Sequence, residues 1–137
     1  MPVAQPHILP ACRAAALTLL LGAGFAAAAP PRLSDGERAE VAHAVCAGRL
    51  AAQIEQAIAS GDPVIEPLAL RRDWHEALYR SLPSTLRPTD LLNQRMRSRR
   101  QFRALLRTTR HKDERRAGMA RLTLSQQLDT CHALLTR

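Results

Sequence analysis

Two cysteine–histidine pairs contain the side chains of this chain that are best suited to chemistry. His43 and Cys46 are three positions apart, and His132 directly follows Cys131. Two cysteines and two histidines are a legitimate ligand set for zinc. Adjacent residues on a helix point about 100° apart, however, so Cys131 and His132 are poorly placed to share one ion. We therefore expect the two cysteines to form a disulfide, which would consume the thiolates that zinc needs, and we expect no metal.

The beginning of the chain indicates where such a disulfide could form. An apolar run, Ala14–Ala28, follows a polar start, and Ala26 and Ala28 have the spacing of a signal-peptidase site. The run has about 15 residues, fewer than the roughly 20 that span a membrane. The pattern predicts a cleaved signal peptide over residues 1–28 and a single helical domain over residues 29–137, with an uncleaved anchor as the alternative. Export to the periplasm or out of the cell would expose the remaining cysteines to oxidising conditions.

Four segments of the mature chain carry helical patterns, and none alternates apolar and polar residues as a strand would. The predicted helices cover residues 34–60, residues 67–82, residues 88–116 and the segment from Thr123 to near the C-terminus. Ser34 with Glu37 forms a capping box, and Gly61 is suited to a left-handed helix end. Thr123 with Gln126 repeats the capping-box pattern at the expected start of the last helix.

Apolar residues at helical spacing predict the buried face of each helix. The stripe of the first helix includes Cys46 and Ile58, and that of the last helix includes Cys131. The expected buried residues of the second helix are Leu70, Trp74, Ala77, Leu78 and Leu82. The expected buried residues of the third helix are Leu91, Leu92, Phe102, Leu105 and Leu106. His75 lies off the stripe of the second helix, so we expect it to be solvated.

These four helices, joined by short turns, predict an all-α fold, a small antiparallel four-helix bundle. The first and last helices can be neighbours in this topology, which would let Cys46 and Cys131 bond across 85 residues of sequence. Two free buried thiols and an intermolecular disulfide are the alternatives.

Basic residues are concentrated in one part of the sequence. Residues 95–121 contain eleven basic residues and two acidic ones, whereas residues 34–66 contain six acidic residues and two basic ones. On a helix, five of the arginines fall within about 100° of arc and form a cationic ridge. The ridge residues are Arg99, Arg100, Arg103, Arg107 and Arg110. Such a ridge is typical of a surface that binds an anionic partner. Two alternatives are a solvated face in an arginine-rich chain and neutralisation of the ridge by acids of another helix, for which the candidates are Glu37, Glu40 and Glu55.

Two short motifs resemble those of known families. The segment 122–126 (LTLSQ) resembles the L-T-x-x-Q motif of small helical periplasmic stress chaperones, which are also exported and basic. The segment 128–132 (LDTCH) resembles the haem-attachment motif of cytochrome c′-type bundles. Leu128 stands where that motif has its first cysteine, so we expect no haem or other cofactor.

The sequence therefore predicts an exported binding protein, chaperone-like or inhibitor-like, whose arginine ridge binds an acidic protein or an anionic envelope component. Contact with a membrane surface is compatible with the ridge. Nucleic acid is an unsuitable partner, because the chain is predicted to be exported and has few aromatic residues for base stacking. A helical enzyme with an unrecognised site and a structural accessory of an envelope or secretion system are the alternatives.

Overall fold

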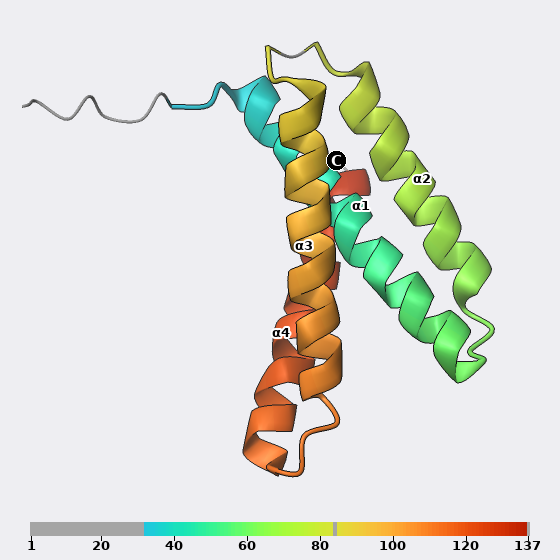
Figure 1. The fold of residues 1–137 in the computed structure, drawn as a ribbon. Helices are drawn as coiled ribbons and strands as arrows, with labels where there is room; N and C mark the ends of the chain where they lie inside the picture. The colour runs from blue at the N-terminus through green and yellow to red at the C-terminus, as the bar shows by residue number, and fades with distance from the viewer. Residues whose placement is uncertain (1–31, 84, 137) are drawn as a thin grey trace, which may run out of the picture. The chain divides into compact units, whose positions relative to one another are not determined.

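The computed structural model describes residues 32–83 and 85–136, and the regular structure in these ranges consists of four α-helices (Figure 1). They are α1 (Asp35–Ser60), α2 (Ile65–Ser81), α3 (Pro88–Thr108) and α4 (Glu114–Leu135). The predicted all-α fold with one internal disulfide is thus confirmed. The predicted signal peptide lies outside the described residues. None of the described helices is long and apolar enough to cross a membrane.

Helix α1 is the centre of the bundle. It packs extensively against both α2 and α3, while α4 packs on α3 and contacts α1 over a shorter stretch (Figure 1). The ends of α1 are those that local sequence signals predict. Ser34 and Glu37 form the capping box in both directions, and Gly61 ends the helix with a left-handed φ of 68°.

Small residues let α1 approach α3 closely. Ala44, Ala47 and Ala52 are buried, and Gly48 lies at the tightest point of the contact. A Cβ atom added to Gly48 would lie 2.3 Å from the carbonyl oxygen of Arg95 and 3.1 Å from the backbone nitrogen of Arg99. These atoms belong to the backbone of α3, so they cannot rotate away as a side chain could.

We expect the Gly48→Ala variant to be destabilised by about 1–3 kcal/mol, because the added methyl group must force α1 and α3 apart. The matched control is Gly118→Ala in α4, where the added Cβ would have no neighbour within 4 Å. Alanine favours a helix over glycine, so the control is expected to gain up to about 1 kcal/mol. Urea denaturation of both variants measures the difference, and equal stabilities would contradict the close contact.

The predicted boundary between the last two helices is wrong. Helix α3 ends at Thr108 instead of continuing to Arg116, and α4 begins nine residues before Thr123. The reason is a stronger cap upstream, since the Asp113 carboxylate accepts hydrogen bonds from the backbone nitrogens of Arg115 and Arg116. Thr123 lies inside α4, where its hydroxyl donates to the Met119 carbonyl.

The predicted buried face of α2 is also wrong. Leu70 and Trp74 remain 59% and 57% exposed, whereas Leu68 and His75 are buried. Helix α2 packs mainly on α1, so only a narrow strip of its surface is covered. That strip contains polar residues, and it lies on the side of the helix opposite Leu70 and Trp74. Two further residues expected inside on other helices, Ile58 and Leu92, are exposed for the same reason: no neighbouring helix covers them.

One partly buried carboxylate, Glu76, connects α2 to α3. A carboxylate oxygen of Glu76 lies 2.5 Å from a guanidinium nitrogen of Arg95 on α3. On its own helix, the same carboxylate lies 3.9 Å from the guanidinium of Arg72 and 3.4 Å from that of Arg80. The Glu76–Arg95 salt bridge joins α2 to α3 directly beside His75, the residue that precedes Glu76 in the chain.

Candidate functional site

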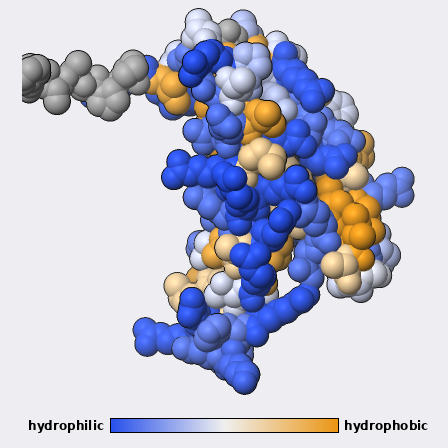
Figure 2. Space-filling view, viewed as in Figure 1, coloured by the Kyte–Doolittle hydropathy of each residue, from blue (hydrophilic) through white to orange (hydrophobic). Residues whose placement is uncertain are grey.

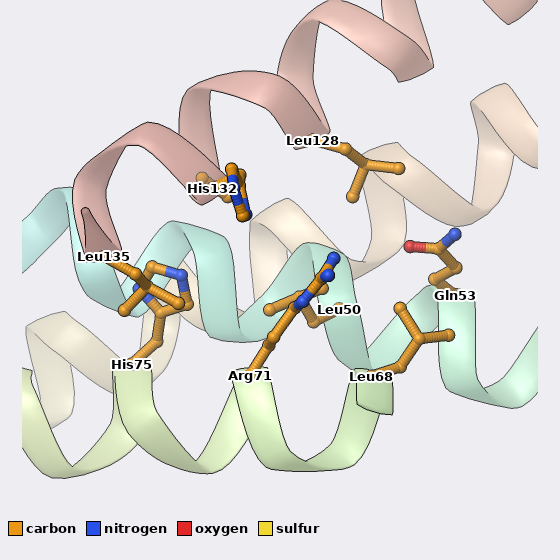
Figure 3. Close-up of a pocket in the computed structure, with 9 residues that line it drawn as sticks. Leu50, Gln53, Leu68, Arg71, His75, Leu128, His132 and Leu135 are labelled. Atoms are coloured by element: carbon orange, nitrogen blue, oxygen red, sulfur yellow. The ribbon is translucent and has the colours of Figure 1, made fainter. Parts of the chain in front are cut away.

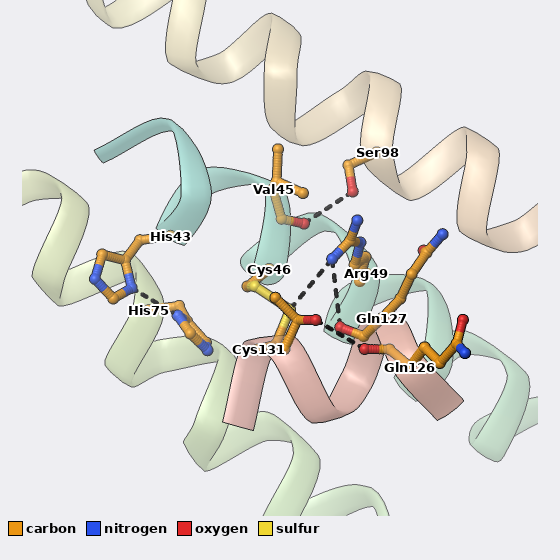
Figure 4. The surroundings of a disulfide bond; sticks show 10 residues. His43, Val45, Cys46, Arg49, His75, Ser98, Gln126, Gln127 and Cys131 are labelled. Atoms are coloured by element: carbon orange, nitrogen blue, oxygen red, sulfur yellow. Dashed lines mark hydrogen bonds between the residues drawn. A yellow bond between two sulfur atoms is a disulfide. The ribbon is translucent and has the colours of Figure 1, made fainter. Parts of the chain in front are cut away.

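The disulfide forms between the two cysteines that the sequence predicted to pair. Cys46 of α1 and Cys131 of α4 are both buried, with their Cα atoms 5.5 Å apart (Figure 4). The bond joins the first and last helices across 85 residues of sequence. Arg49, one turn after Cys46, donates to the carbonyl oxygen of Gln127 at 3.3 Å and lies 3.7 Å from the Cys131 sulfur.

A buried pair of histidines lies beside the disulfide. His43 is one turn before Cys46 on α1, and His75 reaches it from α2, with 2.8 Å between the two Nδ1 atoms (Figure 4). His75 is 0% exposed. The expectation that His75 is solvated is therefore wrong, because the sequence does not reveal which side of α2 meets α1.

The histidine pair is held in its neutral form. A hydrogen bond between two Nδ1 atoms requires a proton on only one of them. Burial, and then repulsion from a charge on His43, lower the pKa of His75 to about 4, while a backbone contact with Cys131 acts in the opposite direction. Burial also lowers the pKa of His43. The Nε2 atom of His75 is buried without a well-formed hydrogen bond.

A cavity of about 80 Å³ opens next to this pair, between α1, α2 and α4 (Figure 3). Its walls are mostly leucine side chains, with Leu50 from α1, Leu68 from α2 and Leu128 from α4. Arg71 and His132 reach its exposed edge. The volume suits one or two water molecules and is far below that of a typical substrate pocket.

The four residues considered for zinc do not form a ligand set. The cysteines are bonded to each other, the Nδ1 atom of His43 is hydrogen-bonded to that of His75, and His132 is exposed. In the part of the chain that the structure describes, no group of three or more histidine, cysteine or acidic residues is arranged to hold a metal ion.

The structure divides the predicted arginine ridge into two parts. Arg99 and Arg103 both form ion pairs with Glu55 of α1. Among the described residues, no ion pair reaches Arg100, Arg107 or Arg110, and Arg110 lies beyond the end of α3.

Sequence reasoning missed one residue of this surface. Arg97 is exposed, has no ion pair in the described ranges and lies on the outward side of α3. Its spacing of three residues from Arg100 is the signal that could have identified it. We call Arg97, Arg100, Arg107 and Arg110 the outer arginine surface. Figure 2 shows hydrophilic side chains along most of α3 on this face of the molecule.

Comparison with known proteins gives no relative from which a role could be transferred: no family model matches the chain, and neither a curated protein nor a solved structure matches it.

Proposed function

We propose that this chain is an exported helical binding protein that uses the outer arginine surface to bind an acidic segment of another protein. One observation carries the proposal. Glu55 reaches the middle of α3 and forms ion pairs only with Arg99 and Arg103. The arginines of the outer surface are therefore left to solvent or to a partner. The disulfide supports export, because such bonds persist in oxidising compartments.

The outer arginine surface is under electrostatic strain in the free protein. Like charges three or four residues apart on a helix each cost a few tenths of a kcal/mol. Arg97 and Arg100 are three apart, and neither has an acidic neighbour that forms an ion pair within the described residues. An anionic partner would relieve this repulsion, so binding is favoured by the same charges that disfavour the unbound helix.

The chemistry of arginine favours carboxylates with a fixed spacing. A guanidinium group binds a carboxylate through two parallel hydrogen bonds, and this geometry adds specificity to charge. Arg100 and Arg107 are seven residues apart, which is about 10.5 Å along a helix axis. Acidic side chains two turns apart on a partner helix have the same spacing. We therefore favour an acidic polypeptide over a lipid surface.

Two double variants of equal net charge test this proposal. Arg100→Gln with Arg107→Gln removes outer arginines, and Arg99→Gln with Arg103→Gln removes those that pair with Glu55. With poly-L-glutamate as the probe, we expect the outer variant to bind at least fivefold more weakly, with a smaller dependence on salt. The inner variant should bind nearly as well as the wild type but unfold at lower temperature, because it loses the Glu55 ion pairs.

Titration calorimetry at several salt concentrations, together with thermal unfolding, provides both readouts. Equal weakening by the two variants would show that only net charge matters and would contradict a defined surface. Tighter binding to anionic phosphatidylglycerol vesicles than to poly-L-glutamate would replace the acidic protein with a membrane as the partner.

A further inference from the structure

A second hollow lies away from the disulfide, where α1, the end of α2 and the start of α3 meet. It has a volume of about 370 Å³, within the usual range of small-molecule pockets. Leu82, Leu91 and Leu92 supply apolar walls, and Tyr79 adds an aromatic ring. The outer arginine surface and the histidine pair contribute nothing to its lining, so this hollow stands apart from the proposed function.

The acidic group of this hollow is Glu40 of α1. Glu40 is only 3% exposed, and among the residues that the structure describes its buried Oε2 atom has no hydrogen-bond partner. Leaving a buried carboxylate oxygen unpaired is costly, and carboxylates are among the groups least often found fully buried without a partner. Two partly buried acids elsewhere in the bundle, Glu55 and Glu76, are both held in ion pairs.

The nearest cation on the rim is already engaged elsewhere. Arg80 lines the hollow, but its guanidinium forms an ion pair with Glu76 at 3.4 Å and lies 5.9 Å from the centre of the Tyr79 ring. In residues 32–83 and 85–136, no arginine or lysine forms an ion pair with Glu40. The buried carboxylate therefore faces an apolar hollow with unused acceptor capacity.

We propose that this hollow binds a small organic ammonium ion with an apolar body. The ammonium group would donate to the carboxylate of Glu40, which lines the hollow, and the apolar body would cover the leucine walls. Tyr79 adds apolar contact to the body of the ligand, because its ring lines the same hollow. A neutral ligand would leave the charge of the carboxylate uncompensated, so the site discriminates by the charge at one end of the ligand.

Three probes of the same size and shape test the proposal: 2-phenylethylamine, 2-phenylethanol and phenylacetate. We expect the amine to bind saturably in a ¹H–¹⁵N NMR titration, with the largest shifts at Tyr79 and Leu91. The alcohol should bind at least tenfold more weakly, and the carboxylate should not bind, because its charge would meet that of Glu40.

The Glu40→Gln variant keeps the size of the side chain and removes its charge, so we expect it to lose at least tenfold in amine affinity and to lose the preference over the alcohol. Glu66→Gln is the matched control, because Glu66 is exposed on α2 and does not line the hollow. Should Glu40→Gln fail to fold, the comparison of the three probes on the wild type still decides. No saturable binding of the amine, equal affinity for amine and alcohol, or shifts centred on Trp74 would each overturn the proposal.

Discussion

Replacing Cys46 and Cys131 together with alanine is expected to lower the free energy of unfolding by roughly 4–5 kcal/mol. The bond closes 85 residues of sequence, and the chain-entropy account of disulfides assigns this value to a loop of that length. Small domains are stable by only about 5–15 kcal/mol in total, so the loss would remove a large share of the stability. Urea denaturation of the wild type and the variant measures it.

Reduction of the wild-type protein provides an independent check of this prediction. Dithiothreitol should destabilise the wild type to about the level of the double variant and should leave the variant itself unchanged. A wild-type protein whose stability does not respond to reductant, or a double variant as stable as the oxidised protein, would contradict the structural role of the bond. Because Cys131 also packs beside His75, the variant reports the loss of both the crosslink and some local packing.

Acidification is expected to destabilise the protein through His75. The pKa of His75 is about 4 in the folded chain and near 6.5 when unfolded. Between these values the unfolded chain binds more protons, so stability falls as the pH falls. The contribution of neutral His75 to the free energy of unfolding is fully present above about pH 6.5 and is lost progressively towards pH 4. The difference corresponds to about 3 kcal/mol.

The titratable and charged groups around His75 also disfavour its protonated form. His43 faces it from α1 and has a lowered pKa of its own. Arg71 of α2 and His132 of α4 line the neighbouring cavity, and positive charge on either would further disfavour a charged His75. Positive charge in this region therefore has no acidic partner within the cavity lining, and protonation of both histidines would break the hydrogen bond between the two Nδ1 atoms.

The test is the slope of stability against pH between 6.5 and 4. The His75→Leu variant should lose most of this slope, because it lacks the histidine whose pKa falls furthest on folding, and His43 should account for the slope that remains. His132→Leu is the control, since His132 is exposed and should keep the wild-type slope. A wild-type slope that persists in His75→Leu would assign the acid sensitivity to other groups.

Local signals in the sequence were sufficient for the all-helical class, for both ends of α1 and for the choice of cysteine partners. Ser34, Glu37 and Gly61 act within one or two turns of their own helix, so their effect does not depend on the rest of the fold. Cys46 and Cys131 lie on apolar stripes of helices that are adjacent in the simplest bundle, and burial then brings them together.

The rotation of α2 and the partners of its buried groups were decided only by tertiary structure. The strip that meets α1 contains His75, and Leu70 and Trp74 of the apparent stripe stay exposed, because a helix with one main neighbour buries only the narrow side that its ion pairs and close contacts select. The pairing of Glu55 with Arg99 crosses 44 residues of sequence and could not be inferred from spacing. The close approach of α1 to α3 at Gly48 depends in the same way on two helices meeting, a long-range property that no local pattern encodes.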